Sequence, residues 1–178
     1  CKSNNIEEIY VFKKTPIGDD YRHKKIKHNY FDLKINFCQK CHFVQLSNVI
    51  NPDRVYGEYL YITETSVGLI SHFEGLVNDL FKKKILKSTS QVLEIGSNDG
   101  SLQKILRRKC YFAVGVDPAI HLTKDKDLIT MKGLYDNKFS KKVEGKFNKF
   151  DVIIANNVIA NIDNLDTVFR GIHYNLVD

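Results

Sequence analysis

Apolar and polar residues alternate in blocks along the chain, and after about residue 66 these blocks predict two kinds of element. Four short runs are almost wholly apolar, as in strands buried on both faces of a parallel sheet; they cover residues 92–95, 113–116, 127–131 and 150–155. Elsewhere apolar residues recur every three or four positions, the spacing of amphipathic helices. This spacing predicts helices over residues 67–85, 102–106 and 165–176, the first with Ser66 as its N-cap.

Strands that alternate with helices predict an α/β fold with a parallel, right-handed, doubly wound sheet. In such a sheet the ligand lies beyond the carboxyl ends of the strands, where the strand order reverses. The first and fourth runs should therefore be neighbours, with the ligand between their ends.

The first 60 or so residues follow a different pattern, with a mixed strand expected over Phe31–Phe37. Two cysteines follow as Cys38-Gln-Lys-Cys41, and Cys1 is interpreted as the second member of another pair whose first member lies upstream. Tetrahedral zinc sites commonly join two such pairs, so the sequence predicts a structural zinc held by Cys1, Cys38 and Cys41. A redox pair or two ordinary buried cysteines are the alternative interpretations. Without an upstream cysteine, a fourth ligand could come from His23, His28 or His42.

Glycines frame the loop that follows the first apolar run. The stretch Gln91–Ser101 reads Q-V-L-E-I-G-S-N-D-G-S, so Gly96 and Gly100 bracket a polar turn before the next helix. The second run ends on Asp117, 21 residues after Gly96, and ~20 residues is the separation at which an acidic residue meets ribose hydroxyls. The sequence therefore predicts an adenosine-type ligand.

The acidic character of this loop decides between adenosine ligands. A dinucleotide loop follows G-x-G-x-x-G, because the pyrophosphate must approach the backbone at a helix N-terminus. Here the loop is G-S-N-D-G, and Asp99 would place a negative charge where phosphates would lie. Together with Glu94, Asp99 favours a cationic ligand without phosphate, such as S-adenosylmethionine (SAM). The competing interpretation is that any βαβ unit has a glycine in its first turn.

The composition and charge of the chain limit the kinds of binding partner that we expect. The 178 residues are 43% hydrophobic and 27% charged, with a formal net charge of +6, as in a globular protein. The basic clusters 82–84 and 107–109 fall at expected helix C-termini, where cations complement the helix dipole, so we expect no nucleic-acid partner. The excess positive charge would also suit the binding of a polyanionic small substrate such as a nucleoside diphosphate. No apolar run approaches the ~20 residues of a membrane span and no signal-peptide pattern opens the chain, so we expect a cytoplasmic protein without a membrane partner.

Five groups of residues, taken in order, resemble one family over essentially the whole chain. They are Cys1 and Cys38-x-x-Cys41 with Val44-Gln-Leu46; Tyr59-x-Tyr61 with Ser66 and His72-Phe-Glu74; Glu94–Gly100; Gly115–Pro118; and Ala155–Val158 with Ile162. The chain thereby resembles the SAM-dependent sugar C-methyltransferases of deoxysugar biosynthesis, which carry an N-terminal zinc-binding domain. The resemblance implies a small zinc-binding domain over residues 1–60 and a Rossmann-like, SAM-binding methyltransferase domain over residues 61–178. Because the chain begins at Cys1 and ends at Asp178, we expect both domains to be truncated.

The resemblance also implies a reaction, in which a methyl group passes from SAM to carbon 3 of a nucleotide-linked 4-keto sugar by way of an enolate. It implies catalytic positions at Tyr59 and at Asn161, which stands where many members have histidine and cannot titrate near pH 7. The family's principal His/Glu cluster would lie after Asp178, so we expect this chain alone to bind SAM and zinc without turnover. The implied SAM contacts are Glu94, Gly96, Ser97, Asn98, Asp99, Gly100, Asp117, Pro118, Gly133, Leu134, Ala155 and Asn156.

Three other functions stay open at the level of sequence. The first is a methyltransferase that acts on oxygen or nitrogen of another small molecule, for which Asn161 leaves room. The second is a non-catalytic, zinc-containing binding module, and the third is an NAD-dependent enzyme acting on nucleotide sugars. The missing third glycine of the loop argues against the third. The sequence identifies neither the sugar nor the oligomeric state.

Overall fold

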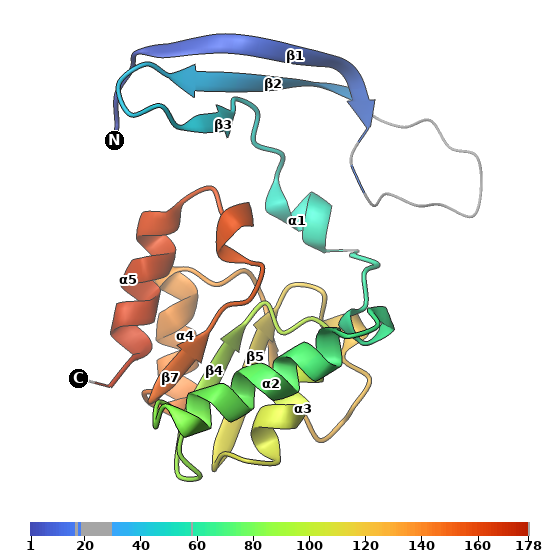
Figure 1. Cartoon of the computed structure of the whole chain (residues 1–178), viewed down its shortest axis with the longest axis vertical. Coiled ribbons are helices and arrows are strands. Elements are labelled where there is room, and N and C mark those ends of the chain that lie inside the picture. The colour runs from blue at the N-terminus through green and yellow to red at the C-terminus, as the bar shows by residue number, and fades with distance from the viewer. Residues whose placement is uncertain (17, 19–29, 58, 178) are drawn as a thin grey trace. The chain divides into compact units, whose positions relative to one another are not determined.

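The computed structural model of the chain describes residues 1–16, 18, 30–57 and 59–177. The chain divides into two units, Cys1–Val55 and Tyr56–Asp178 (Figure 1). The domain boundary expected near residue 60 stays a prediction, and the division by contacts falls slightly before it. His23 and His28, two of the candidate zinc ligands, lie outside the described residues.

The first unit is built on a three-stranded antiparallel sheet of order β1-β2-β3. Its strands are β1 (Ile6–Pro16), β2 (Tyr30–Cys38) and β3 (Val44–Leu46), and the short helix α1 (Pro52–Tyr56) follows them. The strand predicted over residues 31–37 is confirmed as β2. The sequence pattern does not predict β1, because most of its side chains are exposed and no regular alternation marks it.

The second unit contains a four-stranded parallel sheet of order β6-β5-β4-β7. Its strands are β4 (Gln91–Ile95), β5 (Phe112–Asp117), β6 (Ile129–Lys132) and β7 (Val152–Ile154). All four predicted strands are confirmed, and so is the α/β fold class. The first and fourth strands are neighbours as expected, with Glu94 of β4 level with Ile154 of β7.

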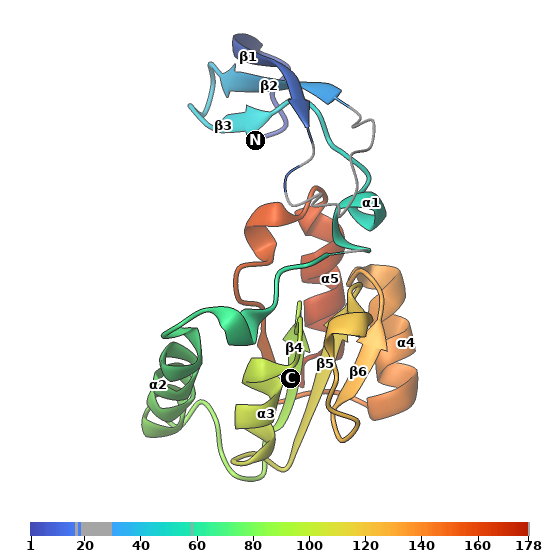
Figure 2. The ribbon, with the colours of Figure 1, turned by 90° about the vertical axis from the view of Figure 1, so that its right-hand side faces the viewer.

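Helices cover both faces of this sheet. The longer helices are α2 (Leu69–Lys82), α3 (Ser101–Arg107), α4 (Asn137–Phe147) and α5 (Leu165–Asn175), and three short 3₁₀ turns are η1 (Thr63–Thr65), η2 (Ile120–Leu122) and η3 (Ile159–Asn161). Figure 2 shows α2 and α3 on one side of the strands and α4 on the other. Within the described part of the chain, no helix combines the length and the apolar character needed to cross a membrane.

The core has two halves because successive strand residues point to opposite faces of the sheet. Val92 and Ala113 pack with the buried residues of α2 and α3, whereas Leu93 and Val114 pack with those of α4 and α5. Both faces of the central strands are thus closed by apolar side chains, and the polar residues that follow each strand are left at its carboxyl end. This arrangement positions the site.

The predicted helix over residues 67–85 is shorter than expected, and its predicted N-cap is wrong. The helix begins at Leu69, and its N-cap is Gly68, with a left-handed φ of 90°. Ser66 lies two residues before this cap, and its hydroxyl hydrogen-bonds the Tyr61 hydroxyl at 2.7 Å. Val67 precedes the helix and is fully exposed, so its apolar side chain does not belong to the buried face of the helix.

Helix α4 is missing from the sequence-based prediction because lysines dominate it. Phe139, Val143 and Phe147 nevertheless recur every four residues, and Val143 is completely buried. Asp136 caps the helix, since its side chain accepts hydrogen bonds from the backbone N–H groups of Lys138 and Phe139. An acidic N-cap before an apolar repeat of four is the signal that could have located α4.

Lys84, just after α2, offers a test of backbone strain. Its φ is 59°, the left-handed conformation that glycine usually adopts after a helix and that costs other residues roughly 1–2 kcal/mol. Lys84→Gly is therefore expected to raise the free energy of unfolding by about 1 kcal/mol in urea denaturation. Lys83→Gly is the matched control, because Lys83 has a φ of −78° and should gain nothing. Equal effects of the two substitutions would contradict the strain.

Candidate functional site

The loop between β4 and α3 is held in an unusual backbone conformation. Gly96, Asn98 and Gly100 all have positive φ, at 74°, 50° and 83°. A Cβ atom on Gly96 would lie 2.2 Å from Cγ2 of Val158, a residue that follows β7. The loop thus turns sharply at the carboxyl end of β4 and approaches the chain that leaves β7.

Asp117 ends β5 and points toward this loop. One carboxylate oxygen accepts the backbone N–H of Asn98 at 2.8 Å, and the other accepts that of Ala119 at 2.7 Å. Burial raises the pKa of Asp117, and these two hydrogen bonds act in the opposite direction. Each carboxylate oxygen can accept a further hydrogen bond, so Asp117 can hold the loop and still receive hydroxyl groups.

Glu94 is the buried acidic residue of the site. Its Oε2 atom has no hydrogen-bond partner among the described residues, and its side chain is 5% exposed. Burial raises the pKa of Glu94 well above its ordinary value, and the nearby carboxylates of Asp117 and Asp99 raise it further. We call Glu94, Asp99 and Asp117 the acidic cluster. A positively charged group beside Glu94 would stabilise its ionised form, so the cluster fits a cationic ligand.

The side chains of Asn98 and Asp99 do not point into open space. The Asn98 amide binds the backbone of Tyr61 and Thr63, and one oxygen of Asp99 accepts the backbone N–H of Glu64 at 2.8 Å. The other oxygen of Asp99 accepts the N–H of Ser101, at the start of α3. The sequence alone does not indicate these contacts, because they join segments about 35 residues apart.

Three buried polar atoms lack a partner among the described residues, and all three belong to the carboxyl ends of β4 and β7. They are Glu94 Oε2, Ser97 Oγ and Asn156 Nδ2. Continuing the register Glu94–Ile154 by two residues places Asn156 level with Gly96. Unsatisfied buried polar atoms are rare, and a group of them at one edge is the pattern expected where a ligand or ordered water supplies the missing partners.

Gly115 is not among the predicted SAM contacts, but its lack of a side chain matters at this site. A Cβ atom there would lie 2.4 Å from Ser97 Oγ and 2.8 Å from Gln103 Oε1. Glycine in the middle of β5 therefore makes room for Ser97 beneath the loop. The sequence does contain a signal for this position, because a lone glycine inside an apolar strand often marks a close approach of another part of the chain.

The remaining predicted residues lie around the same edge. Gly133 and Leu134 follow β6, and the Gly133 N–H donates to the carbonyl of Asp117 at 3.2 Å. Pro118 follows Asp117, and Ala155 follows β7. The structure therefore brings every predicted SAM contact to the carboxyl ends of the four strands or to the loops beyond them.

The two predicted catalytic residues differ in their surroundings. The Tyr59 carbonyl accepts a hydrogen bond from His121 Nε2 at 3.1 Å, and the Tyr59 ring tilts against that of Tyr61. Asn161 is exposed in η3, and its side-chain amide donates to the carbonyl of Asn157 at 3.2 Å. The Asn161 side chain therefore hydrogen-bonds within its own loop, and its predicted catalytic role stays a prediction.

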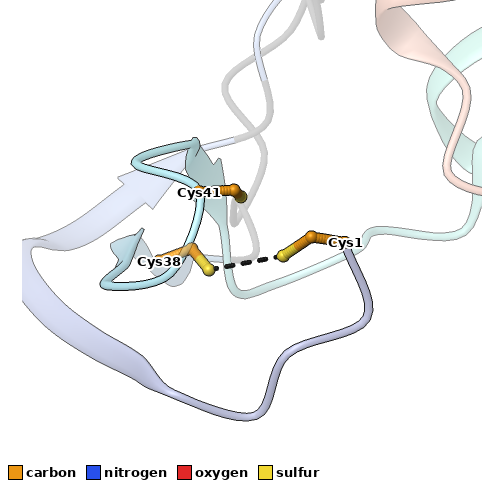
Figure 3. Close-up of side chains that lie close together, drawn as sticks. All are labelled: Cys1, Cys38 and Cys41. Carbon is orange, nitrogen blue, oxygen red and sulfur yellow. Dashed lines mark hydrogen bonds between the residues drawn. The ribbon is translucent and has the colours of Figure 1, made fainter.

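In the first unit, three cysteines converge (Figure 3). The sulfur atoms of Cys1, Cys38 and Cys41 all lie within 4.8 Å of one another, and those of Cys1 and Cys38 are 3.6 Å apart. Two sulfurs bound to one tetrahedral zinc would be ~3.8 Å apart, so the triad fits such an ion. Backbone N–H groups of Cys41 and Lys40 lower the pKa of Cys38, which favours the thiolate that binds metal. His42 instead stacks on Phe37 with ring centroids 5.7 Å apart.

Comparison with known families assigns the second unit. A family described as "Methyltransferase domain" matches residues 70–178, more than half of the chain. The chain belongs to this methyltransferase family. A second family, described as "Putative zinc binding domain", matches residues 1–56, the unit that carries the cysteine triad. SAM is thus the cofactor that this methyltransferase family implies, and the donor set of the site fits it.

Individual relatives of this methyltransferase are distant. The C-methyltransferase NovU of Streptomyces niveus is 26% identical over 145 residues, which are 80% of this chain and 34% of NovU. The chain therefore spans about a third of the length of this curated relative. A solved structure titled "putative s-adenosyl-l-methionine-dependent methyltransferase", from Methanococcus maripaludis, is 17% identical with a TM-score of 0.47, covering 64% of this chain and 55% of that one. The YcgJ protein of a Bacillus species is 16% identical with a TM-score of 0.42, covering 60% and 46%.

Proposed function

We propose that the second unit binds SAM at the carboxyl ends of β4, β5 and β7. The observation that carries this proposal is the buried oxygen of Glu94, which has no hydrogen-bond partner among the residues that the structure describes and lies beside two further carboxylates. An ionised carboxylate in such a place is costly unless a cation compensates it, and SAM carries an ammonium and a sulfonium group. The loop has no third glycine for a pyrophosphate, so a dinucleotide fits less well.

Each end of the ligand has a residue suited to it. Asp117 has acceptor capacity for the ribose hydroxyls, and the Glu94 oxygen that no described residue contacts would receive the amino group of the methionine part. The loop over residues 96–100 would border the ligand, and Asn98 and Asp99 would hold the shape of this loop because their side chains are already hydrogen-bonded to the backbone of residues 61–64. Pro118, Gly133 and Leu134 would lie beside the adenine, and Ala155 and Asn156 would line the opposite wall.

For the reaction, we propose C-methylation of a nucleotide-linked 4-keto sugar. The C-methyltransferase NovU, similar over 80% of this chain, supports transfer to carbon, and the family resemblance supports the sugar. SAM supplies the electrophilic methyl group. Tyr59 is the residue of this chain that we place nearest the acceptor, where its hydroxyl would hold or move a proton. The Asn161 amide can orient a substrate but cannot act as an acid or base.

The test is a calorimetric and thermal-shift titration with S-adenosylhomocysteine (SAH). A ligand at 100 times its dissociation constant stabilises a fold by about 2.7 kcal/mol. SAH should stabilise the chain by such an amount, and NAD at the same concentration should not compete with it. Failure of SAH to bind would overturn the proposed function. Nucleic-acid binding that falls steeply with salt, with no response to SAH, would instead favour the non-catalytic, zinc-containing binding module.

Asp117→Asn tests the ribose assignment. The amide keeps one oxygen for the loop but loses the charge, so SAH affinity should fall about tenfold, as for the loss of a hydrogen bond to a charged group. Asp151→Asn is the matched control: Asp151 also accepts a backbone N–H, from Gln91 at 2.7 Å, but at the amino end of the sheet. Equal affinities of the two variants would contradict the assignment.

The acceptor is tested separately. With SAH bound, a nucleotide-linked 4-keto sugar should stabilise the chain further, because its diphosphate and sugar add contacts. The matching nucleotide-free sugar is the control and should add little. If neither responds while SAH binds, the O- or N-methyltransferase becomes the better interpretation, and Asn161 is the residue that favours it.

We also propose that Cys1, Cys38 and Cys41 hold a structural zinc. Cys38→Ser should weaken zinc binding by at least an order of magnitude, because a thiolate ligand is lost. Cys110→Ala is the matched control, since Cys110 is buried in the core of the second unit and is not a member of the triad. Equilibrium dialysis with metal analysis measures both. Equal zinc content in the two variants would contradict the site.

A further inference from the structure

Asn98 is the most completely bonded residue of the site. Its backbone N–H donates to Asp117, and its carbonyl accepts from the hydroxyl of Thr123 at 3.0 Å. Its side-chain oxygen accepts from the backbone N–H and the hydroxyl of Thr63, at 3.0 and 3.2 Å. Its side-chain nitrogen donates to the carbonyl of Tyr61 at 3.0 Å. One residue therefore joins the β4–α3 loop, the end of β5 and the segment that precedes α2.

The backbone of Asn98 explains why asparagine can do this. Its φ of 50° is left-handed, a conformation that glycine and asparagine tolerate best. Glycine would allow the same turn but offers no side chain. The loop thus has an amide at a position where the turn alone would accept glycine, and that amide binds the Tyr61–Thr63 backbone.

Two further contacts hold the same segment, residues 59–65, which we call the tyrosine segment. Asp99 accepts the backbone N–H of Glu64, and His121 donates to the carbonyl of Tyr59. His121 belongs to η2, which follows β5. The tyrosine segment is therefore tied to the loops after both β4 and β5, two of the loops to which the proposed function assigns the cofactor.

We propose that Asn98 is a positioning residue, which transmits occupancy of the cofactor loop to the tyrosine segment and thereby places Tyr59 for the acceptor. This inference rests on the proposed function, since it needs a ligand at the loop. The physical reason is linkage: a ligand that orders the β4–α3 loop also orders whatever is bonded to it, and the coupling is reciprocal. The acceptor side of the site would then form fully only after the donor is bound.

Amide hydrogen exchange followed by NMR tests this, because the N–H groups of Thr63 and Glu64 report the segment directly. In the wild-type chain, saturating SAH should slow exchange of both amides roughly fivefold or more, within the usual range of coupling. Asn98→Gly keeps the left-handed turn but removes the amide side chain. In that variant SAH should still slow exchange of the Ser101 amide, while the Thr63 amide responds less than about twofold.

Asn148→Gly is the matched control. Asn148 also has a left-handed φ, of 63°, but caps the far end of α4. It should leave the response of Thr63 and Glu64 unchanged. Asn98→Asp is a second variant that keeps the oxygen acceptor for Thr63 and loses the donor to Tyr61, so it should retain part of the response even where Asn98→Gly folds poorly.

The outcomes separate the two proposals. If SAH does not bind the wild-type chain, the proposed function fails and this inference fails with it. If SAH binds but exchange at Thr63 and Glu64 does not change, only the inference fails. An unchanged response in Asn98→Gly would also overturn it, because a purely structural asparagine would alter stability without altering the effect of the ligand on these amides.

Discussion

Replacing Gly96 with alanine is expected to lower the free energy of unfolding by about 2–5 kcal/mol and to abolish SAH binding. The left-handed φ of 74° costs a non-glycine residue roughly 1–2 kcal/mol. The new Cβ would also lie 2.2 Å from Val158 Cγ2, and overpacking of this kind typically costs ~1–3 kcal/mol. Urea denaturation measures the loss of stability, and calorimetry measures the loss of binding.

Two variants separate the causes of that effect. Val158→Ala removes the atom that Gly96→Ala would meet, so the double variant should recover the steric part but not the backbone part. Gly145→Ala is the matched control, because a Cβ there meets nothing within 4 Å and the glycine lies inside α4. That change should stabilise the chain by about 0.5–1 kcal/mol. A Gly96→Ala variant as stable as wild type would contradict the described geometry.

Replacing Glu94 with glutamine is expected to weaken SAH binding roughly 10- to 150-fold at a pH above the raised pKa of Glu94, the range for loss of a hydrogen bond to a charged group. The glutamine side chain is isosteric with that of Glu94 but neutral, so it cannot compensate the ligand's ammonium group. Asp151→Asn, which also neutralises a carboxylate, should bind SAH as the wild type does. Unchanged affinity in the Glu94→Gln variant would remove the main support for a cationic ligand.

The pH dependence of binding follows from the raised pKa of Glu94. The ligand prefers the ionised carboxylate, so SAH affinity of the wild type should rise as pH increases through that pKa and level off above it. Glu94→Gln should lack most of this rise. Calorimetry over the pH range in which the chain stays folded measures this rise in affinity.

The stability of the ligand-free chain should change in the opposite sense. Because folding raises the pKa of Glu94, the folded state holds this proton more tightly than the unfolded state, and stability falls as pH rises through the raised pKa. Glu94→Gln should flatten this fall. Part of it should persist, since burial also raises the pKa of Asp117. If stability fell more steeply with pH in the Glu94→Gln variant than in the wild type, a raised pKa of Glu94 in the folded state would be contradicted.

The sequence predicts the parts of this molecule that depend on local pattern. Continuous apolar runs predicted β4, β5, β6 and β7, because strands that are buried on both faces of a parallel sheet are apolar along most of their length. The order of β4 and β7 followed from the general rules for parallel sheets. Asp117 was placed beside the glycine loop by spacing alone, and its carboxylate does point there.

What the sequence could not predict depends on contacts between distant segments. Nothing local indicates that the side chains of Asn98 and Asp99 bind the backbone of residues 61–64 rather than face a ligand. Ser66 looks like a helix cap but hydrogen-bonds Tyr61, and that contact becomes visible only when the turn between them is known. The sulfur distances of the cysteine triad likewise required the antiparallel sheet that brings Cys1 beside Cys38.

The pairing of β4 with β7 has a consequence for how the protein is made. Glu94 and Ile154, which lie level on neighbouring strands, are 60 residues apart in the chain. During synthesis, β4, the glycine loop and β5 leave the ribosome before β7 does. Glu94 and Asp117 are therefore present before Asn156, which would line the opposite side of the proposed site. If SAM binds at this edge as proposed, its site is complete only after contacts of long sequence separation have formed.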